Sequence, residues 1–134
     1  MTDDIDDRWE RGAEKIAEVY AGNVAPIPKG VMPFYDVMLE TIFGTVWNRS
    51  ELPIRDRRLL IMGVIAASGS VETWKIQAQA ALERGELSPD HLRECLIQLA
   101  PYAGYPNVAD FAGPTEELIG AWEQKADRHG GSGP

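Results

Sequence analysis

The chain has 134 residues, of which 44% are hydrophobic and 25% charged, a size and composition typical of one globular domain. Its formal net charge of −8 and the lack of any basic block argue against nucleic acid and anionic membranes as partners. The single cysteine, Cys95, excludes an internal disulfide and any two-cysteine redox or zinc motif. The acidic amino terminus has no apolar signal core, and the longest apolar run, LLIMGVIAASG, is too short to span a bilayer, so we expect a cytoplasmic protein.

The first half of the chain predicts two helices separated by a loop. Apolar residues recur at helical spacing over about residues 3–21, which predicts an amphipathic first helix. The segment NVAPIPKGVMP at 23–33 is rich in proline and predicts a loop. An apolar stripe that begins at Phe34 and ends near Trp47 predicts the second helix, and NRSELP is the next break.

A third and a fourth helix are predicted in the middle of the chain. The third runs from Ile54 to Ser68, and after its charged beginning it is apolar on every side, which is typical of a helix in the core or in a subunit interface. Ser70 is a candidate N-cap of a short alanine-rich helix, and Gly85 lies where a C-terminal cap belongs.

The last third of the chain predicts two more helices. Ser88-Pro89-Asp90 has the pattern of an N-cap followed by a first turn, and the helix that it begins reaches about Tyr102. AGYP predicts a turn, and a final helix is expected from about Asn107 to Gln124 with an interruption at Gly113-Pro114. No segment alternates with period two long enough to predict a strand. We therefore expect an all-α fold of about six helices, with one domain over residues 1–127 and a disordered tail at 128–134.

The order of these segments resembles a known family. DDRWERGAEKIAEVYAG, ETIFGTVWNRSELPIRDRRLL and AALERGELSPDHLRECLIQLAPYAGYP are together similar to the carboxymuconolactone decarboxylase family. The resemblance implies an AhpD-like helical fold that assembles as a homo-oligomer, a trimer or a hexamer, through apolar helices. It also implies a small-molecule substrate and a decarboxylation that uses no metal and no organic cofactor.

Two positions depart from the pattern of the family. True lactone decarboxylases carry a Glu and a His spaced E-x-x-x-H on the alanine-rich helix, and here Thr73 and Gln77 hold those positions. Neither side chain titrates near neutral pH, so proton transfer by this pair is not expected. Neutral hydrogen-bond donors can still stabilise a developing enolate, and we therefore keep Thr73 and Gln77 as candidate substrate-binding residues.

The peroxidase branch of the same fold uses C-x-x-C-x-x-x-H on this helix, and the matching positions here are Ser70, Thr73 and Gln77. Without a thiolate at these positions, we expect no thiol peroxidase activity. Cys95 lies on the apolar stripe of the next helix, where a buried, unreactive thiol is expected.

Other matching positions are retained. Glu40 matches an acidic position of the decarboxylases and is the candidate catalytic acid/base, with a solvated surface acid as its alternative. Arg55 and Arg57 match paired arginines; Arg57 is the candidate anion holder, with an interfacial ion pair as its alternative. Trp47 and Trp74 could line an apolar pocket, or could instead anchor the core or an interface.

Two functional interpretations follow from these residues. The first is a cofactor-free enzyme of the family that acts on a small lactone or cyclic carboxylate by decarboxylation or related proton transfer. The second is a family member that has lost catalysis and serves as a ligand-binding or assembly protein. Burial of the pocket residues by Trp47 and Trp74 would favour the second, and an open apolar pocket that contains Glu40 would favour the first.

Overall fold

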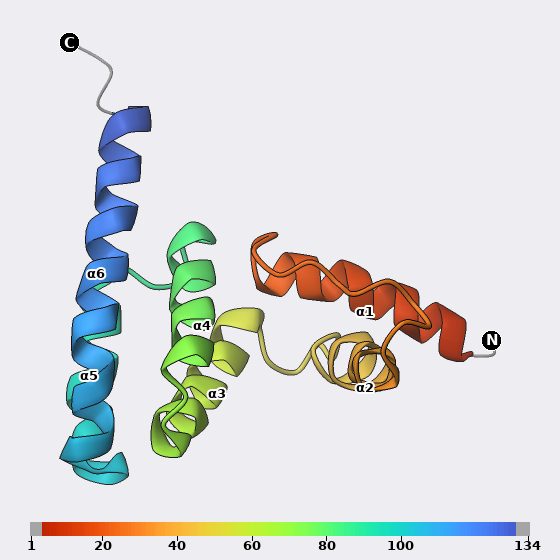
Figure 1. The fold of residues 1–134 in the computed structure, drawn as a ribbon, viewed down its shortest axis with the longest axis horizontal. Helices are drawn as coiled ribbons and strands as arrows, with labels where there is room; N and C mark the ends of the chain where they lie inside the picture. Colours follow the sequence, from red (N-terminus) through yellow and green to blue (C-terminus); the bar gives the residue numbers. More distant parts are fainter. Residues whose placement is uncertain (1–3, 131–134) are drawn as a thin grey trace. The chain divides into compact units, whose positions relative to one another are not determined.

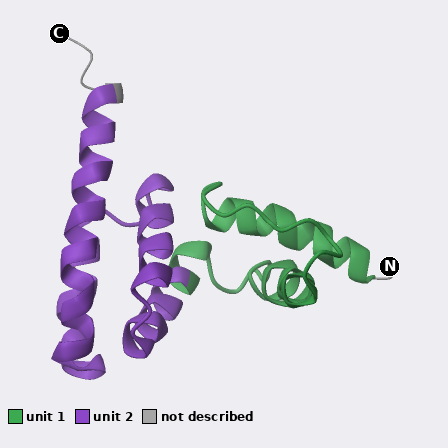
Figure 2. Cartoon of the chain, viewed as in Figure 1, with its two compact units in different colours: residues 1–57 green, residues 58–134 purple. Residues whose placement is uncertain are grey.

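The computed structural model describes residues 4–130, and this part of the chain is helical without a strand. The elements in chain order are α1 (Ile5–Val19), α2 (Pro33–Met38), the π-helix η1 (Leu39–Val46), α3 (Ile54–Ser68), α4 (Val71–Glu83), α5 (Pro89–Ala103) and α6 (Tyr105–Gly130) (Figure 1). The predicted all-α fold class is confirmed. The chain divides into two compact units, residues 1–57 and 58–134, with the boundary inside α3 (Figure 2). The expectation of a single domain over residues 1–127 stays a prediction.

The core of the first unit is formed by α1 and η1. Its buried side chains come from both helices and from the residue after η1: Ile16, Val19, Leu39, Phe43 and Trp47. The rings of Phe43 and Trp47 stack with centroids 6.1 Å apart. Gly12 allows the close approach of the two helices, because a Cβ atom there would lie 1.9 Å from the carbonyl oxygen of Leu39.

The second predicted helix forms over the expected residues, but it widens into a π-helix after Met38. The wide turn is visible in bonds that span five residues: the Trp47 amide donates to the Ile42 carbonyl at 2.9 Å, and the Thr45 hydroxyl donates to the Glu40 carbonyl at 3.1 Å. Short π-helical segments occur frequently at functional sites. Glu40 therefore lies on an unusual piece of backbone that the apolar stripe did not predict.

The predicted loop at 23–33 is held against α1 by polar contacts. The indole N–H of Trp9 donates to Asp36 at 3.2 Å, and the same carboxylate accepts from the Gly30 amide at 3.1 Å. Lys29 forms an ion pair with Asp6 and lies over the Trp9 ring, 5.9 Å from its centroid. These contacts fix the loop beside the first helix.

The second unit has one hydrophobic cluster, which lies around Trp74. The members that α3 to α6 and the loop after α4 bury are Met62, Ala66, Trp74, Ala78, Ala81, Leu82, Leu87, Leu92, Phe111 and Ile119. The ring of Trp74 meets Phe111 edge to face at 5.4 Å. Its indole N–H donates to the Thr115 hydroxyl at 2.9 Å, so the polar atom of the buried ring is satisfied.

The expected interruption of the last helix at Gly113-Pro114 is wrong. Helix α6 continues through both residues, because Val108 and Phe111 before them and Thr115 and Ile119 after them share one buried face. The helix also begins earlier and ends later than expected, at Tyr105 and Gly130. Residues 128–130 are thus helical and not part of a tail, and the remainder of the predicted tail, 131–134, lies outside the described residues.

The predicted helix caps are borne out in position, with one difference. Ser88 forms a capping box with His91, in which each side chain accepts the backbone N–H of the other residue, at 3.1 and 3.0 Å. Ser70 lies at the N-cap of α4, but its hydroxyl bonds to a side chain instead of to a backbone N–H. The positive φ of Gly85, 69°, ends α4 as expected.

Candidate functional site

The two candidate residues on α4 have very different surroundings. Thr73 is exposed, and its hydroxyl oxygen accepts a hydrogen bond from the Ser70 hydroxyl at 2.6 Å. Gln77, four residues later, is only 1% exposed. The shared helical face predicted from their spacing therefore passes from solvent into the core within one turn, and a ligand can reach Thr73 without reaching Gln77.

Gln77 belongs to a buried polar network. Its amide oxygen accepts a hydrogen bond from Nη1 of Arg58 at 2.9 Å, and Arg58 is itself 0% exposed. The same guanidinium donates to both carboxylate oxygens of Glu86, at 2.6 and 3.3 Å. A fully buried charge requires this kind of pairing. Gln77 thus helps to hold Arg58 in place, a role that the sequence analysis did not assign to it.

Glu86 is the anionic partner in the network. Burial alone would raise the pKa of its carboxyl group, but hydrogen bonds from Arg58 and Arg84, with the charges of the same two residues, outweigh burial and leave the pKa below its usual value. Arg84 donates to Glu86 from Nε. Glu86 therefore stays ionised near neutral pH and does not exchange a proton there.

Sequence analysis missed Arg58 as a member of this network. The signal was present, since Arg58, Met62 and Ala66 recur every four residues and are the buried positions of α3. A charged residue at the first of these positions predicts a buried ion pair.

Trp74 and Trp47 are both part of hydrophobic cores. Trp74 is 0% exposed and is fixed by Phe111 and Thr115, while Trp47 is 6% exposed and stacks on Phe43. Both rings thus lie in a hydrophobic core, as in the alternative that they anchor the core. A role for either ring in contacting a ligand stays a prediction.

Glu40 is half-buried on η1. Among the residues that the structure describes, its carboxylate takes part in no hydrogen bond or ion pair, and only its backbone carbonyl accepts one. The negative charge of Glu40 acts on Lys29, whose pKa is raised above its usual value, first by its hydrogen bond to Asp6 and further by the negative charges of Asp6, Glu10 and Glu40. Glu40 and this ammonium group both lie in the first unit.

Arg55 and Arg57 lie at the beginning of α3 and contact other groups of the chain. Arg57 donates from Nε to the Leu52 carbonyl at 3.1 Å and from Nη2 to the Arg49 carbonyl at 2.9 Å. Its guanidinium group therefore stabilises the loop before α3. Arg55 lies 3.6 Å from Asp56 in an exposed ion pair. The structure thus places Glu40, Trp47 and Arg57 in the first unit, and Thr73, Trp74 and Gln77 in the second.

Each unit has a surface hollow. In the first unit, an almost entirely apolar hollow of about 480 Å³ lies along α2 and the beginning of η1, lined by Pro33, Phe34, Val37, Met38, Thr41 and Ile42. In the second unit, a hollow of about 250 Å³ is lined by Glu83, Trp122, Lys125 and Ala126. Neither hollow contains a candidate residue from the sequence analysis.

The described residues supply no metal-binding group of three or more His, Cys, Asp or Glu side chains. Cys95 is half-buried and packs against the core of the second unit, as its apolar stripe predicted. Across residues 4–130, no helix combines the length and the apolar character that crossing a membrane requires.

The architecture described above is that of an all-α protein whose middle helices carry the residues of interest. A family model described as the carboxymuconolactone decarboxylase family matches residues 33–117, and the chain belongs to that family. The match covers η1 with Glu40 and α4 with Thr73 and Gln77.

Two curated proteins are similar to the chain. One is 4-carboxymuconolactone decarboxylase of Acinetobacter baylyi, 29% identical over 73 residues, which cover 54% of each protein. The other is nitrosuccinic acid decarboxylase npaB of Metarhizium robertsii, 25% identical over 95 residues, which cover 71% of this chain and 66% of that protein. The chain thus spans from about half to two thirds of the length of these relatives, and no solved structure matches it.

Proposed function

We propose that the protein is a cofactor-free decarboxylase that acts on a small carboxylated lactone or a related small acid, with Glu40 as the catalytic acid. The observation that carries the proposal is the half-buried carboxyl group of Glu40, which forms no hydrogen bond or ion pair with any described residue and lies within reach of the charge of Lys29. A side chain that transfers protons must be accessible to the substrate, and its reactive group must not be engaged in bonds that stabilise the fold. Both similar proteins are named as decarboxylases, which supports the reaction class.

The proposed step breaks the bond between the substrate carbon and its carboxylate. Carbon dioxide leaves, and the bonding electron pair stays on the substrate, where a lactone carbonyl or a nitro group spreads the charge. Glu40 then relays a proton from water to that carbon, which replaces the lost carboxylate. Lys29 would attract the anionic substrate, and in this proposal it takes the part that the sequence analysis assigned to Arg57.

The residues of α4 contribute differently in this proposal. Thr73 is an exposed neutral donor that can orient a substrate oxygen, while Gln77 supports the helix through Arg58. We further propose that the protein is a homo-oligomer, a trimer or a hexamer. Leu60 and Val64 support this proposal, since they lie four residues apart on α3 and are 63% and 69% exposed.

The burial of Gln77 and Trp74 favours a second candidate function. Two positions proposed for substrate contact are 1% and 0% exposed, as expected if this part of the chain now serves packing. The protein would then be a catalytically lapsed member of the family that binds a ligand or promotes assembly.

Turnover measurements separate the two functions. The purified protein is incubated with 4-carboxymuconolactone and, separately, with nitrosuccinic acid, and release of carbon dioxide is followed. Glu40→Gln is expected to abolish turnover, whereas Glu14→Gln, which alters an exposed acid on α1, is the matched control. Turnover that survives Glu40→Gln would refute the role of Glu40. An absence of turnover with both substrates would favour the lapsed function.

A further inference from the structure

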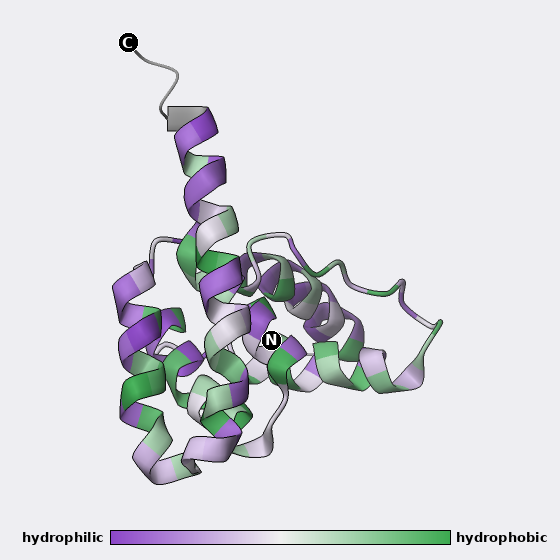
Figure 3. Cartoon of the chain, turned by 60° about the vertical axis from the view of Figure 1, so that its left-hand side comes forward, coloured by the Kyte–Doolittle hydropathy of each residue, from purple (hydrophilic) through white to green (hydrophobic). Residues whose placement is uncertain are grey.

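The first unit has exposed apolar side chains that take no part in its core. None of the six residues of α2 is buried, although Phe34 and Val37 are large apolar side chains, 72% and 56% exposed. Ile42 on η1 is 44% exposed, whereas Leu39 and Phe43 of the same helix belong to the core. Figure 3, coloured by hydropathy, shows hydrophobic segments along α2, where the loop at 23–32 ends. Exposed apolar side chains that lie together in this way are typical of a binding surface.

These side chains surround the apolar hollow of about 480 Å³, which is lined by Pro33, Phe34, Val37, Met38, Thr41 and Ile42. Thr41 is the one polar residue of the six, and its hydroxyl donates to the Val37 carbonyl at 2.6 Å. The lining residues therefore present no charged side chain, and their one hydroxyl proton is already bonded. A charged group placed in the hollow would lose water without gaining a partner, which is costly, whereas an apolar group would not.

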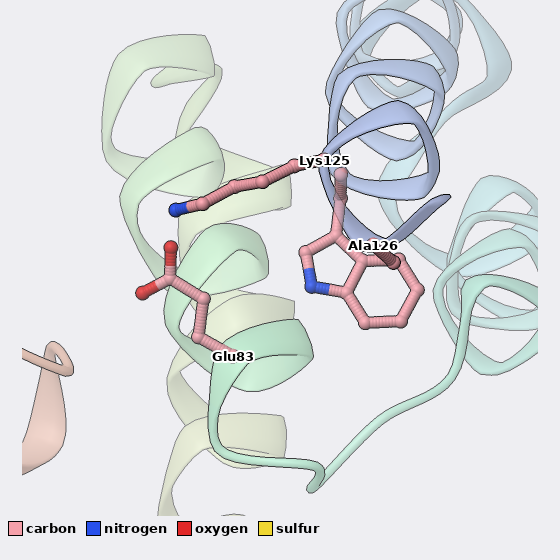
Figure 4. A pocket seen from close by; sticks show the side chains of 4 residues that line it. Glu83, Lys125 and Ala126 are labelled. Carbon is pink, nitrogen blue, oxygen red and sulfur yellow. The ribbon is translucent and has the colours of Figure 1, made fainter. Parts of the chain in front are cut away.

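The hollow of the second unit differs in this respect. Figure 4 shows that two of its lining side chains, Glu83 and Lys125, carry opposite charges and point toward one another. The hollow of the first unit has no such pair, and its volume lies within the range of roughly 300–1,000 Å³ that is usual for ligand pockets. The ligand that fits its lining is a small apolar molecule or the apolar part of a larger one.

The hollow lies beside Glu40 on the same helical segment. Helix α2 continues into η1 without a break, since the backbone of Leu39 at their junction is helical, with φ −67° and ψ −37°. Val37 precedes Glu40 by three residues, and side chains three residues apart on a helix are neighbours. Thr41 directly follows Glu40. A ligand whose apolar part occupies the hollow can therefore extend toward Glu40.

We propose that this hollow binds a small aliphatic or aromatic group, and that in the reaction of Glu40 it holds an apolar substituent of the substrate. The second part of this inference rests on the proposed function. The preferred substrates are then small acids that carry an apolar group beside the carboxylated carbon. Because each buried methylene contributes to binding, affinity should rise about 2–4-fold for every methylene added to the ligand.

Binding is tested without turnover, by titrating the full chain with the straight-chain alcohols ethanol, butanol and hexanol. The methyl signals of Val37 and Ile42 are followed in carbon-edited NMR spectra of methyl-labelled protein. We expect both signals to shift and saturate, with hexanol binding about 4–16-fold more tightly than butanol. Affinities that do not depend on chain length, or signals that stay in place with hexanol, would overturn the proposal.

A matched pair of variants locates the site. Val37→Ser removes a lining side chain and is expected to weaken hexanol binding by about 3–10-fold. Val46→Ser alters a valine of η1 that is 43% exposed and is not among the residues that line the hollow, so it should leave binding unchanged. The Ile42 signal reports binding in both variants. Equal hexanol affinities of the two variants would place the alcohol elsewhere and overturn the proposal.

Turnover separates this inference from the proposed function. The probe α-nitrohexanoic acid resembles nitrosuccinic acid, but an alkyl chain replaces its second carboxylate arm. After subtraction of the spontaneous reaction, kcat/KM should be at least about 4-fold higher for α-nitrohexanoic acid, and Val37→Ser should abolish this advantage. Equal kcat/KM values would overturn the inference and leave the proposed function standing. Saturable methyl shifts without turnover of either acid would refute the proposed function and still confirm the apolar site.

Discussion

Arg58 and Gln77 are joined by a buried hydrogen bond of 2.9 Å between α3 and α4. Gln77, at which the resemblance to the family's decarboxylases predicts a histidine, thus bonds a guanidinium group through its amide oxygen. Because Arg58 also carries the ion pair to Glu86, this contact lies at the centre of the polar structure of the second unit.

Replacing Arg58 by methionine is expected to lower the free energy of unfolding by about 3–5 kcal/mol, because the Glu86 carboxylate then loses its main buried partner. The matched control is Arg49→Met, which removes an exposed arginine in the loop before the same helix and is expected to change stability by less than about 0.5 kcal/mol. Urea denaturation measures both. Equal effects of the two substitutions would contradict the structural role of Arg58.

The low pKa of Glu86 predicts a dependence of stability on pH. The folded-state pKa lies below the usual value of 4.5, so the ionised group contributes stability above that pH, and the contribution is lost as the pH falls through the folded-state pKa. The stability difference between the native protein and Glu86→Gln should therefore be largest near pH 7 and shrink below about pH 4.5. A difference that is constant between pH 7 and pH 3 would count against it, with Glu117→Gln as the exposed control.

The bond between Trp74 and Thr115 predicts a measurable coupling. Thr115→Val leaves the indole N–H buried without its acceptor, which is expected to cost about 1–3 kcal/mol. The same substitution in a Trp74→Phe background should cost about 1 kcal/mol less, because no indole N–H remains to be satisfied. A double-mutant cycle by thermal or urea unfolding gives this difference, and a coupling of zero would contradict the bond.

Two glycines provide opposite predictions. Gly12→Ala places a Cβ atom against the Leu39 carbonyl and is expected to cost at least about 2–3 kcal/mol, because backbone on both sides must move. Gly120→Ala fills open space inside α6 and is expected to add about 0.5–1 kcal/mol through better helix propensity. Unfolding curves of the two variants should shift in opposite directions, and a neutral Gly12→Ala would refute the close approach.

The proposed assembly predicts a change in mass. The substitutions Leu60→Glu and Val64→Glu together place charge on the exposed apolar face of α3, and they should release monomers, since an unpaired charge is costly in an interface. Light scattering at micromolar concentration measures the result. A native protein that is already monomeric would refute the assembly itself.

Periodicity was sufficient to predict the helices, because each buried stripe repeats at helical spacing. It failed at Pro114, where contacts on both sides of the residue stabilise a helix that local propensity would interrupt. It failed also at η1, since widening of the helix leaves no mark in the apolar pattern. For the candidate site, the spacing of Thr73 and Gln77 predicted a shared helical face. The burial of Gln77 on that face depends on its network with Arg58 and Glu86, which are distant in sequence.

The π-helix holds one residue more in each hydrogen-bonded turn than an α-helix does. Removing one residue between positions 39 and 46 would let the segment close into an α-helix and rotate the side chains on either side of the deletion by about 100° relative to each other. Leu39 and Phe43 could then no longer both face α1. The length of this segment is thus constrained by geometry, so insertions and deletions during evolution should be excluded between positions 39 and 46, where the buried Leu39, Phe43 and Gly44 also restrict which residues fit.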